Sequence, residues 1–298
     1  MNVSGVFPAL TTPYHEDGSV SVEHFKANLL RYHKTGLAGY VVLGSTGESV
    51  LLSAAEADSL LIAGKQAAAP GEVLIAGTGA ESTAETIDRT KRAAELGYHF
   101  ALVKTPYYYK PMYSMETYVA HFRRVADASP IPVLLYSVPI FTNVSLEARD
   151  IAVLSEHPNI VGIKDSSSHV QRIAEMVSVA PAAFQILTGG AAVVLPSLTV
   201  GARGAILALA SALPEKCVAL YDLVRRGQME QARELQNTLL KASKVIVSDA
   251  GIAGVKFVMD QRGYRGGLPR LPLLPAADAS KQRILELLAT LEPAVARA

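Results

Sequence analysis

The sequence has almost no cysteine and no tryptophan. Its single cysteine, Cys217, excludes an internal disulfide, and the apolar stretch around it favours a buried hydrophobic role over a nucleophilic one. An excess of charge of one sign is also missing, because 28 Lys and Arg stand against 27 Asp and Glu, a formal net charge of +1. Such a chain has no general attraction for nucleic acid or anionic lipid, so we expect neither as a partner.

Several common functional motifs are missing as well. Neither Gly-x-Gly-x-x-Gly nor Gly-x-x-x-x-Gly-Lys occurs, and the seven histidines are scattered, so we predict no cofactor and no metal. The N-terminus has no basic segment followed by an apolar run, from which we expect a cytoplasmic protein without a signal peptide. The uncharged stretch 182–202 contains Gly189, Gly190 and Pro196, so we predict a strand, a turn and a helix and no membrane span.

Apolar residues are plentiful, at 50% of the 298 residues, and they occur in short runs that alternate with amphipathic stretches. Eight runs read as strands, at 5–13, 39–47, 73–79, 100–106, 132–139, 160–166, 184–190 and 204–210. Helices are predicted between them, among them 21–35 and 115–128, with capping boxes at Ser53–Glu56 and Ser82–Glu85. Uniformly apolar strands are typical of a parallel sheet that is covered on both faces.

Eight strand–helix units predict an α/β fold, a (β/α)8 TIM barrel, for which about 250 residues are typical. We assign residues 1–225 to the barrel and residues 226–298 to a C-terminal helical extension packed on it, with helices at 228–247, 251–262 and 279–296. In such barrels the active site lies where the strands end and the following loops begin.

Lysine, tyrosine and small hydroxyl side chains dominate these strand ends. Lys164 ends the sixth run and follows the apolar Ile163, and an amine shielded from water is suited to form an imine with a 2-oxo acid. Tyr136, one strand away, is placed to move the proton that expels water. Two alternatives stay open at this point: Lys164 could pair with Asp165 in a structural role, and Lys104 could be the nucleophile.

Two further strand ends complete the predicted site. Ser45, Thr46 and Gly47 offer hydroxyl and backbone N–H groups suited to a small carboxylate, although the segment could equally be a structural turn. Tyr107–Tyr109 are three successive aromatic residues, which are more typical of packing against a partner subunit than of catalysis.

Four motifs together resemble the dihydrodipicolinate synthase and N-acetylneuraminate lyase family. They are Gly44-Ser-Thr-Gly-Glu48, Thr105-Pro-Tyr-Tyr108, Tyr136-Ser-Val-Pro139 and Gly162-Ile-Lys-Asp-Ser166, and the resemblance extends from about residue 4 to 295. It implies a homotetramer, a dimer of dimers, of class I Schiff-base aldolases or lyases acting on pyruvate and a small aldehyde or oxo acid.

The resemblance also implies roles for individual residues. Lys164 would be the Schiff-base nucleophile and Tyr136 the proton shuttle, and Thr46 would link Tyr136 to Tyr108 of a neighbouring subunit. Ser45 and Thr46 would hold the pyruvate carboxylate, with Gly189 and the carbonyl of Ile206 near the ligand. Lys104 would then be structural.

The branch within the family depends on residues 136–143. Dihydrodipicolinate synthases have an arginine where Phe141 stands here, and this arginine grips the carboxylate of the aldehyde substrate. Other stretches resemble 4-hydroxy-2-oxoglutarate aldolases more closely: Glu81-Ser-Thr83, Ser129-Pro-Ile-Pro-Val133, Leu135-Tyr-Ser-Val-Pro139 and His157-Pro-Asn-Ile-Val-Gly162. That branch usually has Thr-Gly where Thr142 and Asn143 stand. We therefore predict cleavage of a 4-hydroxy-2-oxo acid, such as 4-hydroxy-2-oxoglutarate, to pyruvate and an aldehyde.

Other functions remain as alternatives. Within the family they are dihydrodipicolinate synthase (4-hydroxy-tetrahydrodipicolinate synthase) itself, and sugar-acid lyases such as N-acetylneuraminate lyase or 2-keto-3-deoxygluconate aldolase. A phosphosugar barrel would use Gly189, Gly190 and the region of Gly201 and Gly204, where only Arg203 is basic. A catalytically silent ligand-binding barrel is a further possibility, since fold does not dictate function.

Overall fold

The computed structural model describes residues 3–291, and eight parallel strands alternate with helices along this part of the chain. The strands are β1 Gly5–Pro8, β2 Gly39–Val42, β3 Val73–Gly77, β4 Phe100–Lys104, β5 Val133–Ser137, β6 Ile160–Asp165, β7 Gln185–Thr188 and β8 Gly204–Leu207. From β2 to β8 each strand pairs with the next strand in sequence, β1 pairs with β8, and an isolated bridge between Ala9 and Val41 joins β1 to β2. The predicted (β/α)8 barrel is therefore confirmed.

The barrel is closed between its first two strands. The N–H of Leu10 donates to the Val41 carbonyl at 3.0 Å, and the N–H of Ala38 donates to the Val6 carbonyl at 3.0 Å. Side chains such as Phe7, from every second position of the strands, fill the interior. Two further apolar clusters lie between the strands and the surrounding helices.

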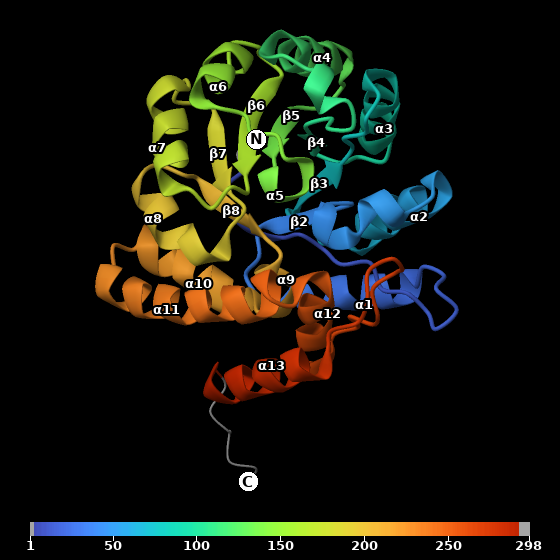
Figure 1. Cartoon of the computed structure of the whole chain (residues 1–298), viewed down its shortest axis with the longest axis vertical. Coiled ribbons are helices and arrows are strands. Elements are labelled where there is room, and N and C mark those ends of the chain that lie inside the picture. Colours follow the sequence, from blue (N-terminus) through green and yellow to red (C-terminus); the bar gives the residue numbers. More distant parts are fainter. Residues whose placement is uncertain (1–2, 292–298) are drawn as a thin grey trace.

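Thirteen α-helices lie within residues 3–291, and most of them surround the strands (Figure 1). They are α1 Val22–Tyr32, α2 Ala54–Ala67, α3 Thr83–Glu95, α4 Met115–Ala128, α5 Pro139–Thr142, α6 Ala148–Leu154, α7 Val170–Val179, α8 Val194–Thr199, α9 Leu209–Ala212, α10 Pro214–Arg225, α11 Met229–Ala242, α12 Gly251–Gln261 and α13 Asp278–Leu291. A π-helix, Ser243–Ser248, joins α11 to α12.

The capping signals are placed as predicted. Ser53 accepts the N–H of Glu56 while the Glu56 carboxylate accepts the N–H of Ser53, which is the complete capping box at the start of α2. At the start of α3 the predicted box is half formed: Ser82 accepts the N–H of Glu85, while the Glu85 carboxylate pairs with Arg89. The predicted helix 115–128 coincides with α4, and the uncharged stretch 182–202 contains β7 and α8 as predicted.

Several strands are shorter than predicted. The run 39–47 leaves the sheet after Val42, because Leu43 takes the left-handed conformation (φ 63°) and a 3-10 helix follows at Ser45–Gly47. The run 204–210 ends at Leu207, and α9 begins at Leu209. The run 5–13 leaves the sheet after Pro8 except for a single bridge at Ala9. Apolar residues continue beyond the strand ends because the loops there are also buried.

The last helices follow the barrel and pack on it. Helix α11 packs on α10 and α8, α12 packs on α9, and α13 packs on α12 at the edge of the molecule (Figure 1). The division of the chain at residue 225 stays a prediction. The predicted helix 279–296 corresponds to α13 as far as Leu291, and its remainder lies outside the described residues.

Cys217 is fully buried in α10, and burial raises the pKa of its thiol to about 12, in keeping with a packing role. Between residues 3 and 291, no helix combines the length and the apolar character needed to cross a membrane.

Candidate active site

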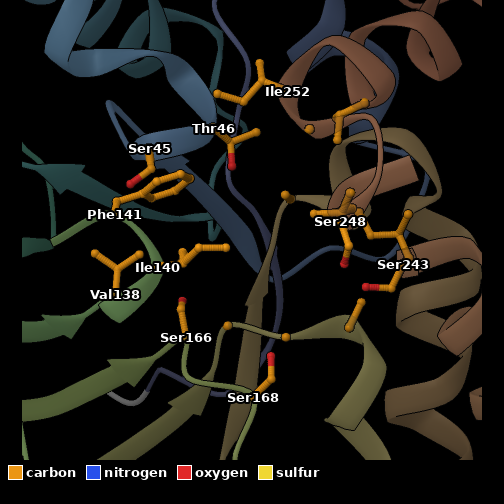
Figure 2. A pocket seen from close by; sticks show the side chains of 18 of the residues that line it. Ser45, Thr46, Val138, Ile140, Phe141, Ser166, Ser168, Ser243, Ser248 and Ile252 are labelled. Atoms are coloured by element: carbon orange, nitrogen blue, oxygen red, sulfur yellow. The ribbon is translucent and has the colours of Figure 1, made fainter. Parts of the chain in front are cut away.

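A cavity of about 380 Å³ lies at the carboxyl ends of the strands. Its wall is formed by side chains from the ends of β2, β5, β6, β7 and β8, together with the π-helix and α12. Figure 2 shows Ile140 and Phe141 on one side of this space and Ser243 and Ser248 on the other. The cavity is therefore where the barrel architecture predicts an active site.

Lys164 and Tyr136 are neighbours across two adjacent strands. Tyr136 of β5 is paired in register with Lys164 of β6, and residues in register on neighbouring strands point to the same face. The Nζ atom of Lys164 lies 4.2 Å from the centre of the Tyr136 ring. Both side chains are buried, with 4% and 5% of their surface exposed, yet both line the cavity.

The hydroxyl of Tyr136 is electrostatically prepared to give up its proton. Burial alone raises the pKa of a phenol, but here the charge of Lys164 and hydrogen bonds with Ser45, Lys164 and Ser166 outweigh burial and hold the pKa of Tyr136 below its usual value. Its hydroxyl oxygen lies 3.4 Å from Ser45 Oγ. A tyrosine with a lowered pKa beside an amine is suited to acid–base catalysis.

Asp165 and Lys104, which the sequence left as alternatives, have other partners in the structure. Asp165 does not pair with Lys164: its carboxylate accepts the N–H of Ser167 at 3.0 Å and lies 3.8 Å from Arg172. Lys104, the competing nucleophile, forms an ion pair with Glu81 at 3.0 Å. Glu81 also accepts the backbone N–H groups of Tyr107 and Tyr108. Lys104 therefore anchors a loop at the barrel mouth.

Ser45 and Thr46 form a tight turn at the end of β2 and both line the cavity. The hydroxyl of Thr12 donates to the carbonyl of Gly47 at 2.6 Å and fixes this turn to the loop after β1. The hydroxyl contact with Tyr136 comes from Ser45, and the relay through Thr46 stays a prediction.

Gly189 lies in the wall as predicted, and its lack of a side chain is required there. A Cβ atom at this position would approach Ser166 Oγ to 1.9 Å. A larger residue would displace Ser166, which bonds the Tyr136 hydroxyl. Gly189 therefore leaves room both for the ligand and for this serine.

The two remaining predicted residues do not line the cavity. Ile206 is fully buried in the barrel interior, in register with Phe7 of β1. Tyr108 lies on the surface with 72% of its side chain exposed and stacks edge-on with Tyr109 at 5.0 Å. A contact between Tyr108 and Thr46 would need a second copy of the chain, so it stays a prediction.

Sequence reasoning missed a group of serines in the cavity wall. Ser166 and Ser168 follow β6, and Ser243 and Ser248 begin and end the π-helix. The run of three serines after Lys164 was a usable signal for the first pair. Nothing in the sequence marked the second pair, because the position of the extension over the barrel mouth depends on tertiary packing. Irregular helical turns of this kind are frequent at functional sites.

No group of three or more His, Cys, Asp or Glu side chains suited to a metal ion occurs among residues 3–291. Within the same residues, the cavity wall contains one ammonium group, that of Lys164, and no guanidinium. Apolar side chains also line the cavity, among them Ile140 and Phe141 on the side of Ser45, and Ile252 of α12 (Figure 2).

Comparisons with known proteins agree with this geometry. The model of the dihydrodipicolinate synthetase family matches residues 2–291. A 4-hydroxy-tetrahydrodipicolinate synthase of an Exiguobacterium species is 36% identical over 282 residues, 95% of this chain and 96% of that protein. The enzyme of the same name from Xanthomonas campestris is 38% identical over 279 residues, 94% of this chain and 91% of that protein.

Solved structures extend the similarity to three dimensions. The dihydrodipicolinate synthase DapA-2 of Bacillus anthracis superposes with a TM-score of 0.93 at 26% identity, covering 98% of this chain and 99% of that one. The 4-hydroxy-tetrahydrodipicolinate synthase of Methylacidiphilum fumariolicum SolV gives 0.91 at 30% identity, covering 97% and 95%.

A closed (β/α)8 barrel with a buried lysine beside a tyrosine at the strand ends, in a chain with these relatives, defines a class I carbon–carbon lyase or aldolase, an enzyme that works through a lysine Schiff base. The chain belongs to the dihydrodipicolinate synthetase family.

Proposed function

We propose that Lys164 forms an imine with the C2 carbonyl of a 4-hydroxy-2-oxo acid and that the enzyme cleaves this imine between C3 and C4, which leaves pyruvate bound to Lys164 as an imine. The observation that carries the proposal is the pair of buried side chains at the barrel mouth, with Lys164 Nζ 4.2 Å from the ring of Tyr136. The amine of Lys164 adds to the C2 carbonyl, and the carbinolamine loses water to give the iminium. Tyr136 supplies the proton that leaves with this water.

Cleavage follows from the electron-withdrawing iminium. When the C3–C4 bond breaks, the electron pair moves into the iminium and forms an enamine, and the C4 hydroxyl loses its proton as the aldehyde departs. Protonation of the enamine at C3 and hydrolysis of the imine then release pyruvate. The same steps in reverse join the two halves. Tyr136 is placed to carry the proton of the C4 hydroxyl, because its lowered pKa suits both directions of transfer.

The carboxylate of the 2-oxo acid fits the turn of Ser45 and Thr46. Both residues line the cavity beside Tyr136, and their hydroxyl groups can donate to an anion. A ligand held there has its carbonyl carbon directed toward the floor of the cavity, where Lys164 lies. Gly189 and the serine hydroxyls then surround the half of the substrate that leaves as an aldehyde.

A second candidate is the condensation of pyruvate with aspartate semialdehyde, and the names of the relatives favour it over cleavage of 4-hydroxy-2-oxoglutarate. The cavity favours cleavage, because Phe141 stands where the synthases have their arginine and the described wall offers no guanidinium. Losing a hydrogen bond with a charged partner costs about 1.5–3 kcal/mol of binding.

The two candidates differ in their products. We expect the enzyme to release pyruvate from 4-hydroxy-2-oxoglutarate with a higher kcat/KM than it shows for aspartate semialdehyde plus pyruvate. A coupled assay of pyruvate release gives kcat/KM for cleavage, and mass spectrometry of the cyclic product gives kcat/KM for condensation. The reverse order would assign the enzyme to synthesis, and no turnover of either substrate would contradict the proposal for both.

Phe141→Arg tests the residue that separates the candidates. Phe141 is 62% exposed at the cavity mouth, so a guanidinium fits without disturbing the core. We expect kcat/KM with aspartate semialdehyde to rise roughly 10-fold, because the new charged hydrogen bond replaces the missing one. Ile140→Arg, one position away and 80% exposed, serves as the control for charge alone. An equal gain in both variants, or none, would remove Phe141 from the specificity argument.

We also propose that the enzyme is a homotetramer in which Tyr108 of one subunit reaches Thr46 of another. Large apolar side chains are exposed around the barrel mouth, including Tyr108, Tyr109 and Met112 at 62–79% exposure. A patch of this kind on a soluble protein is typical of an interface. Contact with a second subunit would bury it and complete the proton relay.

A further inference from the structure

The turn that carries Ser45 and Thr46 ends in a buried charge. Glu48 takes the left-handed conformation (φ 55°), and its side chain is shielded from solvent. Its N–H donates to the carbonyl of Ser45 at 3.0 Å, so its position and that of Ser45 are coupled. A left-handed residue other than glycine persists only where its surroundings hold it.

The partner of this carboxylate comes from the far end of the chain. Lys256 of α12 is also fully buried, and its Nζ lies 2.6 Å from Glu48 Oε1. The same ammonium donates to the carbonyl of Leu268 at 2.8 Å and lies 4.5 Å from the centre of the Tyr14 ring. The salt bridge of Lys256 is therefore made with the turn, while Asp260 favours the charge of Lys256 and Arg270 opposes it.

Arg270 adds a second attachment. Its backbone N–H donates to Glu48 Oε2 at 2.8 Å. Its guanidinium donates to the carbonyl of Leu51 at 2.9 Å and to the Glu56 carboxylate at 2.6 Å, and it stacks over Tyr14 at 4.5 Å. Two segments near the C-terminal end of the described chain thus hold both ends of the loop that follows β2.

We infer that Lys256 and Arg270 are positioning residues, which hold the Glu48 turn so that Ser45 and Thr46 meet the substrate carboxylate. The inference rests on the proposed function, since it assigns the carboxylate to this turn. Without Lys256 the Glu48 carboxylate would be buried with the N–H of Arg270 but without its salt-bridge partner, and a buried charge that has lost its ionic partner is strongly destabilising. The nearest relief is rotation of the turn toward water, which moves Ser45 away from Tyr136 and from the ligand.

The test is the pyruvate concentration that gives half-maximal trapping of the enzyme by borohydride. For Lys256→Met we expect this concentration to rise between about 10-fold and 100-fold, because small displacements of a binding group have effects of that size. Trapping at saturating pyruvate should change much less, since Lys164 and Tyr136 stay in the barrel. In the double variant Glu48→Gln/Lys256→Met no lone charge is buried but the ion pair is still lost, so we expect its half-saturating pyruvate concentration to lie between those of Lys256→Met and wild type.

Arg262→Met is the matched control. Arg262 joins the end of α12 to the Ala212 carbonyl and to Glu215 of α10, so its loss weakens the attachment of the same helix without touching the turn. We expect its half-saturating pyruvate concentration to equal that of wild type. If Lys256→Met fails to fold, Arg270→Met is measured in the same way. The side chain of Arg270 is 21% exposed, so its replacement disturbs the core less.

The outcomes distinguish a failure of the proposed function from a failure of the positioning role. Wild-type enzyme that traps no pyruvate would contradict the proposed function itself. If wild type is trapped normally and Lys256→Met has the same half-saturation, the positioning role is wrong. The positioning role is equally wrong if Arg262→Met raises the half-saturating pyruvate concentration as much as Lys256→Met does. It is also wrong if the double variant needs as much pyruvate for half-saturation as Lys256→Met alone.

Discussion

Lys164 and Tyr136 come together because β5 and β6 pair in a register that places them side by side. The layer below them in the barrel is apolar, with Leu134 and Ile206 among its members, so the amine and the phenol are open only toward the cavity. The charge of Lys164, together with hydrogen bonds with Ser45, Lys164 and Ser166, then holds the pKa of the phenol below its usual value. The chemistry of the site thus follows from strand register and from two small hydroxyl groups.

Tyr136→Phe keeps the ring and removes only the hydroxyl. We expect kcat to fall by about 10²- to 10⁴-fold, the usual contribution of a positioned acid–base group, with little change in stability. Because the pKa of Tyr136 is lowered, tyrosinate absorbance should show one tyrosine that ionises first on raising the pH, and this variant should lack it. Tyr98→Phe is the control, since burial raises the pKa of Tyr98 and its hydroxyl bonds the Leu61 carbonyl far from the site. Equal activity losses in both variants would contradict the acid–base role.

The sequence allowed part of this site to be predicted. Residues at the ends of predicted strands, such as Lys164, Tyr136 and Ser45, line the cavity because strand ends converge in any closed barrel. Ser243 and Ser248 could not be predicted, because their place depends on how the extension packs. The side chain of Ile206 is buried in the barrel interior, so the role of its carbonyl stays a prediction, and Tyr108 is exposed on the surface of the single chain.

Among the elements, the hydrophobic runs correctly predicted eight strands but overestimated their length. Hydrophobicity reports burial, and the loops after β2 and β8 are as buried as the strands themselves. The left-handed Glu48 is held by contacts with residues more than 200 positions away, such as Lys256. Capping boxes were more reliable, because they are satisfied within four residues.

His121 of α4 makes the protein less stable in acid. It is 6% exposed and lies 2.9 Å from Thr83 of α3, and burial lowers its pKa to about 4, with the charge of Lys104 adding to the shift. The unfolded chain, with a histidine pKa near about 6.5, binds the proton first, so stability falls as the pH drops from about 6.5 to about 4. The loss should reach about 3 kcal/mol.

His121→Asn keeps a polar group near Thr83 but cannot be charged. Urea unfolding at pH 7 and at pH 4.5 should show a smaller acid-induced loss in this variant than in wild type. His157→Asn is the comparison, because it removes a second histidine, which lies 3.0 Å from Asp127 instead of beside Thr83. An unchanged pH dependence in His121→Asn would mean that other groups cause the acid sensitivity.

For the molecule as a whole, the barrel mouth is both the site of the cavity and the region of exposed aromatic residues. The proposed tetramer would cover Tyr108 and Tyr109 and join two sites. Sedimentation should therefore show a species larger than the 31.6 kDa chain, and specific activity should fall on dilution below its dissociation constant. Tyr108→Ala should lower activity at every concentration. A fully active monomer would contradict the shared relay.

The most direct test of the central claim is to incubate the enzyme with pyruvate and borohydride, digest it and locate the adduct by mass spectrometry. Reduction of the imine fixes pyruvate to the lysine that attacked it. We predict a single adduct on Lys164 and none in a folded Lys164→Ala variant. An adduct on Lys104, or no adduct on folded wild-type protein, would contradict the assignment of Lys164 as the Schiff-base residue.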